Sequence, residues 1–154
     1  EYDRTGGAPL NPIELEAQGI VSSMFSGIID QLATGEKSVI LNGIEPTIKG
    51  LIDQTNHNIG GFKELIDRFT KLEAKLGDYA DQFEFDGEGR NLFTLMIDEK
   101  RRGLQAEIES KQHNIKVNQE IIKILKHYKD KVDEVEKLGY YNSPINITYT
   151  GGPV

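Results

Sequence analysis

Two long stretches of the chain carry apolar residues at alternating spacings of three and four, which is the period of an amphipathic α-helix. Between them stands Asp86-Gly87-Glu88-Gly89, and four polar or glycine residues in that position are typical of a helix–helix turn. The pattern therefore predicts that the chain doubles back near residue 87. We expect an all-α fold built on a long antiparallel, coiled-coil-like helical hairpin, with helices at about 45–85 and 90–138.

The first of these stretches keeps a heptad pattern without a slip. One heptad position holds Ile48, Thr55, Phe62, Phe69, Leu76 and Phe83, and the other holds Leu51, Asn58, Leu65, Leu72 and Tyr79. Ile52, Ile59 and Ile66 widen the apolar stripe on one flank, as expected of a helix that contacts more than one neighbour. The adjacent Gly60 and Gly61 are poor helix formers, and we expect a kink or local fraying there.

The second stretch has a longer and less regular apolar line, which ends before Gly139. Its members are Phe93, Ile97, Leu104, Ile108, Ile115, Ile122, Leu125, Tyr128, Val132 and Val135.

A third helix is predicted near the N-terminus, at about 13–33. It begins at Pro12, a residue suited to the first helical turn, and ends at Thr34-Gly35. Its apolar stripe consists of Ile20, Val21, Met24, Phe25, Ile28, Ile29 and Leu32. A helix on a membrane surface is one interpretation, but the polar face has no Lys or Arg to bind anionic lipid. We therefore expect this helix to pack on the base of the hairpin.

Both ends of the chain differ from the helical domain, which spans 13–139. Residues 1–12 contain glycine and proline without apolar periodicity and predict an extended arm. In the tail, 140–154, apolar and polar residues alternate, which predicts a β-strand that contacts a neighbouring segment or molecule. The apolar positions of this strand are Ile145, Ile147 and Tyr149.

The lengths of the predicted helices do not match. The N-terminal helix covers only ~30 Å of a second hairpin helix on the order of 70 Å long, at about 1.5 Å per residue. The seam nearer the turn therefore needs another cover, and we expect it to bind other protein subunits in a homo- or hetero-oligomer. The residues of this predicted distal seam are Phe62, Ile66, Phe69 and Phe83.

A turn centred between Gly87 and Glu88 predicts that facing residues in the hairpin have numbers that sum to about 175. Both helices then become polar at the same level, and a buried polar layer fixes register at some cost in stability. The predicted register layer is Thr55, His57, Asn58 and Asn118. The alternative is that these residues, with Asn114, form a ligand site.

Charged residues gather at two places. An acidic cluster near the turn suits a basic protein partner, and it does not fit the ligand spacing of a calcium loop. Its members are Asp78, Asp81, Glu84, Asp86 and Glu88. The basic run Lys100-Arg101-Arg102 is expected to pair across the hairpin with Glu64, Asp67 or Glu73.

Composition excludes several kinds of function. The net charge is −7 and there is no cysteine, which argues against general nucleic-acid binding and excludes thiolate chemistry and disulfides. No run of apolar residues reaches the ~18 of a membrane span. His57 and His113, with Glu120, lack the spacing of a helical zinc site. We expect no cofactor, metal or catalytic residue, and the sequence does not fix the compartment.

Three hypotheses follow. The first is a non-catalytic structural protein whose arms and distal seam bind neighbouring subunits in a large assembly, such as a virion. The second is a soluble adaptor or inhibitor that binds a basic partner through the acidic cluster. The third is an enzyme or metal protein built on the layer around His57 and Asn118. The outline resembles the small helical hairpins of the WXG family, but the chain has no Trp and we assign it to no family.

Overall fold

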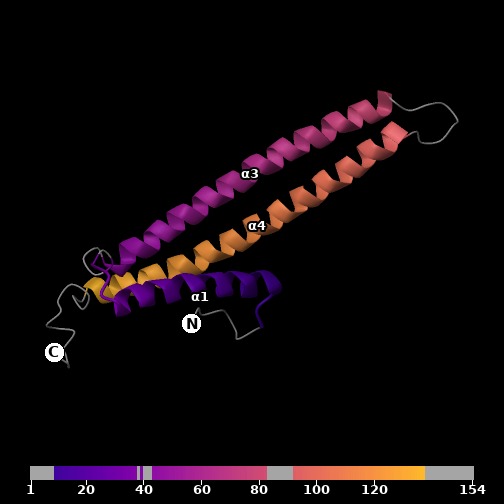
Figure 1. The fold of residues 1–154 in the computed structure, drawn as a ribbon. Helices are drawn as coiled ribbons and strands as arrows, with labels where there is room; N and C mark the ends of the chain where they lie inside the picture. The colour runs from indigo at the N-terminus through magenta and orange to yellow at the C-terminus, as the bar shows by residue number, and fades with distance from the viewer. Residues whose placement is uncertain (1–8, 38, 40–42, 83–91, 138–154) are drawn as a thin grey trace, which may run out of the picture. The chain divides into compact units, whose positions relative to one another are not determined.

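The computed structural model describes residues 9–37, 39, 43–82 and 92–137, without the side chains of 136 and 137. Three helices hold most of these residues (Figure 1): α1 (Pro12–Ala33), α3 (Ile44–Gln82) and α4 (Leu92–Lys137). The predicted all-α character is confirmed for the described residues, and both ends of α1 and the start of α3 agree with the predicted positions to within one residue. The predicted end of the first hairpin helix and the two predicted ends of the second lie outside the described residues. The strand predicted in the tail and the first eight residues of the predicted arm lie outside the described residues.

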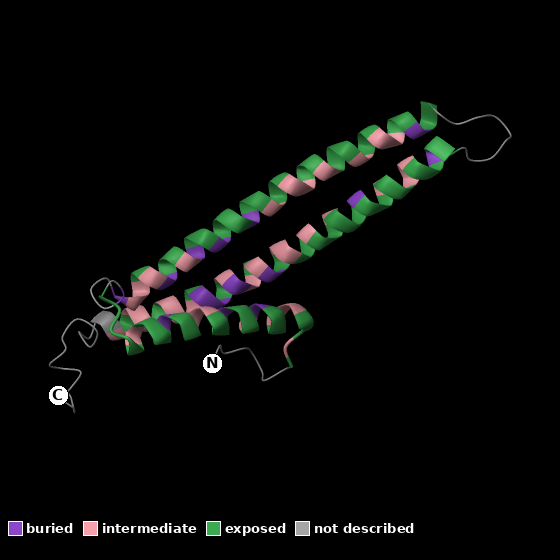
Figure 2. Ribbon diagram, in the orientation of Figure 1, coloured by how far each residue is buried: buried purple, intermediate pink, exposed green. Residues whose placement is uncertain are grey.

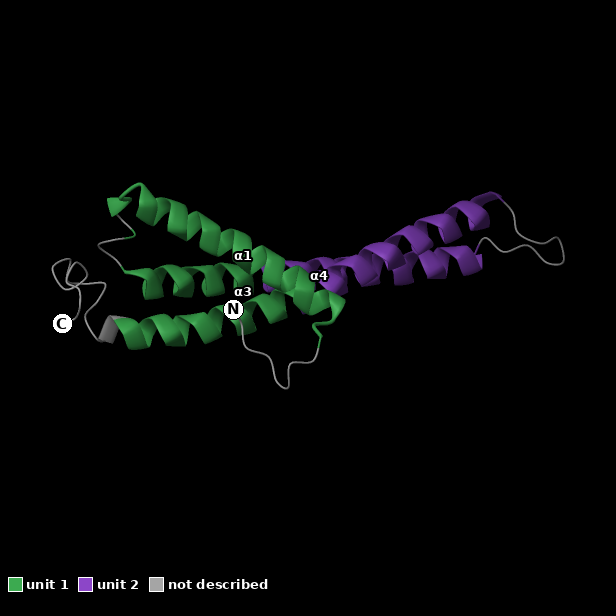
Figure 3. Cartoon of the chain, turned by 90° about the horizontal axis from the view of Figure 1, so that it is seen from below, with its two compact units in different colours: residues 1–57, 117–154 green, residues 58–116 purple. Residues whose placement is uncertain are grey.

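The chain forms two compact units (Figure 3). Unit 1 comprises residues 1–57 and 117–154, and unit 2 comprises residues 58–116. The helices α3 and α4 each contribute to both units, whereas α1 belongs to unit 1 alone.

The ends of α1 are set by local signals in the sequence. The Asn11 side-chain oxygen accepts a hydrogen bond from the backbone amide of Glu14 at 2.8 Å. The backbone amide of Asn11 in turn donates to Glu14 Oε1 at 2.9 Å. This reciprocal capping box satisfies two backbone amides at the start of the helix, and Pro12 follows directly. At the other end Gly35 has a φ of 74°, a left-handed conformation that glycine adopts readily. The predicted start and stop of this helix are thus both confirmed.

Unit 1 has a core made by all three helices. Ala17, Val21 and Ile28 of α1 are buried in it, and Phe25 makes an edge-to-face contact with Tyr128 of α4, with ring centroids 5.2 Å apart. The α1 helix is therefore a core helix, as predicted. Its predicted stripe was partly wrong, because Ile29 is 62% exposed while Ala17, which was not predicted, is fully buried. The contact face is therefore centred on Val21 and Ile28.

On α3 and α4, the unit 1 core consists of Ile48, Ile52, Val117, Ile121, Ile124 and Leu125. Within this unit Lys129 Nζ lies 3.0 Å from Glu45 Oε2, which joins α4 to the first turn of α3. The hydrogen bond to the Glu45 carboxylate, together with the charge of that carboxylate, raises the pKa of Lys129 above its ordinary value of 10.5.

The buried face of α3 is rotated from the predicted heptad seam. Ile52 and Ile59, on the predicted flank, are buried, whereas Leu72 and Tyr79, at a predicted seam position, are each 42% exposed. The first heptad position, which includes Ile48, is buried or half-buried along the described helix. The helix therefore makes its contacts through one heptad position and the flank, and the second heptad position lies at the border of the contact.

In unit 2, α3 and α4 lie side by side and run antiparallel (Figures 1 and 3). Arg101 of α4 places Nη2 at 2.8 Å and Nε at 2.9 Å from Glu73 Oε2 of α3. Gln105 donates to the same oxygen at 3.2 Å. A Cβ on Gly77 would lie 3.1 Å from the Arg101 guanidinium, so the glycine leaves room for this ion pair.

The two ion pairs between α3 and α4 give the register within each unit. The residue numbers sum to 174 both for Glu73 with Arg101 in unit 2 and for Glu45 with Lys129 in unit 1. The predicted sum was 175, and Glu73 was one of three predicted partners of the basic run.

The local fraying expected at Gly60-Gly61 is not found, because α3 is helical without interruption from Ile44 to Gln82. Ile59 is buried and Phe62 is half-buried on either side of the two glycines. Their contacts hold this turn in helical geometry and outweigh the weak helix propensity of glycine.

Candidate functional site

Large apolar side chains are exposed in the half of unit 2 that contains the last turns of α3 and the first turns of α4. On α3 these are Leu72 and Tyr79, and on α4 they are Leu92 at 71%, Phe93 at 64%, Leu95 at 49% and Met96 at 59% exposure. Six of the nine large exposed hydrophobic residues in the described part of the chain belong to this group, so they are concentrated in one region. We call these six residues the unit 2 apolar surface.

The sequence explains why these side chains are exposed. The first turns of α4, Leu92 to Ile97, are apolar in every direction around the helix except at Thr94. A helix that is apolar all round is normally covered on all sides, but in unit 2 only α3 lies against it. Small residues occupy the contact itself, since Thr94 and Ala80 are both buried. Figure 2 shows that most of the ribbon at this end of α3 and α4 is exposed.

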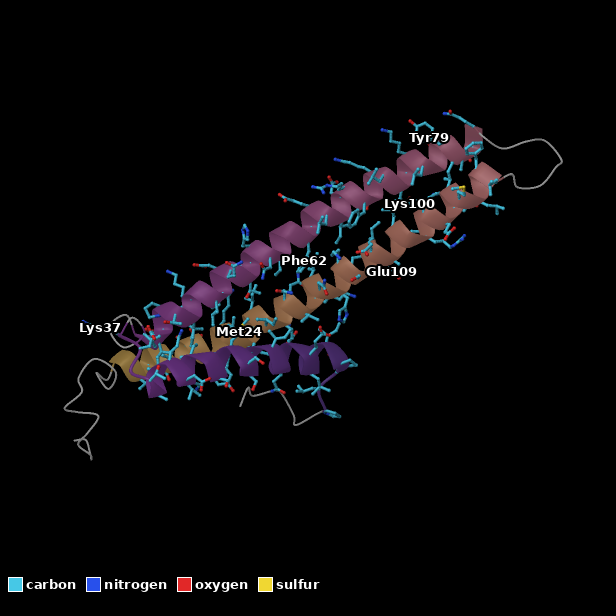
Figure 4. All side chains as sticks on the ribbon, in the orientation of Figure 1. Met24, Lys37, Phe62, Tyr79, Lys100 and Glu109 are labelled. Atoms are coloured by element: carbon cyan, nitrogen blue, oxygen red, sulfur yellow. The ribbon has the colours of Figure 1, made fainter. Side chains whose placement is uncertain are left out.

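The residues predicted as the distal seam lie elsewhere on the same unit. Phe62, Ile66 and Phe69 are half-buried, and Figure 4 marks the position of Phe62 on α3. Phe83 lies outside the described residues. The sequence indicated that this part of the hairpin needs a cover, but the most exposed apolar residues are those at the start of α4. The signal that could have identified them is the apolar run from Leu92 to Ile97, which only Thr94 interrupts.

The predicted polar register layer is only partly buried. Thr55 is 2% exposed and its hydroxyl donates to the Leu51 carbonyl of its own helix at 2.7 Å. Asn118 is half-buried, whereas His57 and Asn58 are exposed. The Thr55 hydroxyl is thus satisfied inside α3, and a role for these residues in setting register stays a prediction.

The acidic cluster is described only in part. Asp78 and Asp81 are exposed on the last turns of α3, while Glu84, Asp86 and Glu88 lie outside the described residues. Binding of a basic partner through this cluster stays a prediction.

The candidate metal ligands are not gathered in one place. In the residues for which positions are described, no group of three or more His, Asp or Glu side chains could hold a metal ion. His57 and His113 are both exposed, and the Glu120 carboxylate lies 3.5 Å from Lys123 Nζ. Within the same residues, no helix combines the length and apolar character needed to cross a bilayer.

No protein-family model, curated protein or solved structure matches this chain. The class that the described residues define is a helical protein with an exposed apolar surface on unit 2.

Proposed function

We propose that this chain is a non-catalytic structural protein of a larger assembly, in which its helical hairpin binds neighbouring subunits through the unit 2 apolar surface. The observation that carries the proposal is the exposure of Leu92, Phe93, Leu95 and Met96 on consecutive turns of α4. Full burial of a side chain of this size contributes about 1.5–3 kcal/mol. Covering several of them at once therefore provides the driving force of a stable protein–protein contact.

The chemistry of the surface favours a protein partner. Aromatic side chains and methionine are enriched at the centres of protein interfaces, where they are fully desolvated. Tyr79 and Phe93 supply the aromatic rings, and Met96 supplies a flexible side chain that adapts to the shape of its neighbour. The terminal arms predicted from the sequence would extend the contact to further subunits, as in a virion or another large assembly.

Replacing three residues of the surface with glutamine tests the proposal. Because the side chains of Leu92, Phe93 and Met96 are mostly exposed, we expect the triple variant to keep its helical circular dichroism. We also expect its incorporation into high-mass complexes of the source cell to fall at least tenfold, since several kcal/mol of apolar contact is lost. Native gel filtration followed by quantification of the chain in each fraction measures this incorporation.

The chain offers a matched control on unit 1. Leu15, Ile20 and Ile29 are three exposed apolar residues of α1, and their triple replacement with glutamine removes a comparable amount of apolar surface. We expect this control to assemble like the wild-type chain. Equal incorporation of the unit 2 variant and the wild type would overturn the proposed function.

A further inference from the structure

Unit 2 has a hollow on one side of its helix pair, with a volume of about 850 Å³. Its apolar lining comes from Phe69 of α3 and from Met96 and Leu104 of α4. The rest of the lining is polar or glycine, namely Glu99, Lys100, Gly103 and Glu107. Seven described residues from two helices thus form an open groove with charged residues among its apolar ones.

The α4 side of this groove has an ordered charge pattern. Lys100 and Glu107 are seven residues apart, which places them on the same face of the helix two turns from each other. Gly103 lies between them, and a Cβ there would have no neighbouring atom within 4 Å. Along the line of Lys100, Gly103 and Glu107 the helix therefore presents a positive charge, a gap and a negative charge in that order, with Glu99 beside Lys100 at the edge of the groove.

Such a pattern is complementary to itself. Two copies of a helix can pack antiparallel about a two-fold axis. A residue on the N-terminal side of the axis in one copy then faces the residue that lies equally far on the C-terminal side in the other copy. With the axis between Gly103 and Leu104, Lys100 of each copy faces Glu107 of the other. Opposite charges therefore meet twice, and the two gaps at Gly103 let the helices approach closely.

We propose that a second copy of this chain docks on this groove, with the two α4 helices antiparallel and centred between Gly103 and Leu104. The inference rests on the proposed function and names the neighbouring subunit as an identical chain. Glu107 is already held at this face by Lys111, whose Nζ lies 3.0 Å from Glu107 Oε1. The Glu107 side chain is nevertheless 55% exposed, so it has room to accept a second cation. Met96 extends the contact toward the unit 2 apolar surface.

Exchange of charges tests this arrangement directly. We expect Lys100→Glu alone and Glu107→Lys alone each to weaken self-association about tenfold or more, because like charges then meet twice. An equimolar mixture of the two variants should associate again, since the chain with Glu at both positions faces the chain with Lys at both. Sedimentation equilibrium or light scattering over a concentration series measures the dissociation constants of the separate variants and the mixture.

Two further variants serve as controls, one on the opposite side of α4 at Glu109 and one at Gly103 in the groove. Glu109 and Lys100 are marked on α4 in Figure 4, and Glu109 lies on a different face from the groove, so Glu109→Lys should associate like the wild type. Gly103→Leu should raise the thermal midpoint of the fold, because glycine is a poor helix former, while it weakens association by filling the gap.

The outcomes separate this inference from the proposed function. The two-fold arrangement would be overturned if Lys100→Glu and Glu107→Lys each self-associated with the dissociation constant of the wild type. It would also be overturned if their mixture associated no more tightly than either variant alone. A wild-type chain that stays monomeric at all concentrations would do the same. If the wild type is monomeric but the triple glutamine variant at Leu92, Phe93 and Met96 still loses incorporation into cellular complexes, the proposed function stands. The neighbouring subunit is then a different protein.

Discussion

Replacing Leu125 with alanine should lower the free energy of unfolding by about 2–5 kcal/mol, the range for deleting a large buried aliphatic side chain. Leu125 has no exposed surface, and it lies in the core that α1, α3 and α4 form together in unit 1. Its loss would leave a cavity among side chains such as Ile48 and Ile124, which are also almost fully buried. Urea denaturation followed by far-ultraviolet circular dichroism measures the change.

The matched control is Leu15→Ala, which deletes the same atoms from a side chain that is 56% exposed. We expect the control to change the free energy of unfolding by no more than about 0.5 kcal/mol, as is usual for surface sites. Equal effects at the two positions would contradict the three-helix core of unit 1, because they would mean that Leu125 is as accessible to water as Leu15.

The second large effect has the opposite sign. Replacing both Gly60 and Gly61 with alanine should raise the free energy of unfolding by roughly 2 kcal/mol, since each glycine in a helix interior costs about 1 kcal/mol relative to alanine. Neither position has a neighbouring atom within 4 Å of an added Cβ, so no steric penalty offsets the gain. Thermal and urea unfolding of the double variant measure it.

A glycine pair that serves as a bend would respond differently. Alanine at a helix break or at a position with positive φ would give no gain or a loss of stability. A destabilised double variant would therefore show that α3 is not continuous at Gly60-Gly61, contrary to the structure. The single variants Gly60→Ala and Gly61→Ala should each give about half of the total, because their added methyl groups point into open space.

The sequence was sufficient for the helices because their signals are local. Asn11, Glu14 and Pro12 specify the start of α1 by hydrogen bonds and backbone geometry within four residues of each other. Gly35 ends the same helix through its own φ angle. The turn composition and the two apolar stripes restrict the register of the hairpin. That register places Arg101 near Glu73, one of the three acidic partners predicted for the basic run.

The details of burial were not predictable from the same signals. Val117, Ile121 and Ile124 are buried although the predicted apolar line of α4 omitted them, and Phe93 is exposed although the line included it. Periodicity identifies the apolar side of a helix, but burial depends on how many neighbours cover it. In unit 1 the α1 helix provides a second neighbour for α4, whereas in unit 2 only α3 lies against it.

The candidate site illustrates the same limit. The unequal lengths of the predicted helices were enough to indicate that part of the hairpin lacks a cover. They could not distinguish Phe69, which α4 half-buries, from Met96, which is 59% exposed. That distinction depends on the rotation of each helix about its axis, which heptad positions define only within the width of the apolar stripe.

The most direct test of the antiparallel pairing is a distance measurement between α3 and α4. Spin labels on Glu64→Cys and Ser110→Cys would occupy two exposed positions of unit 2, and the chain contains no native cysteine. Labelled protein diluted with unlabelled protein should give a separation of about 20–30 Å, because paired helices lie 8–10 Å apart and the labels add the rest. A separation near 70 Å, the length of a continuous helix of the intervening residues at about 1.5 Å each, would contradict the pairing.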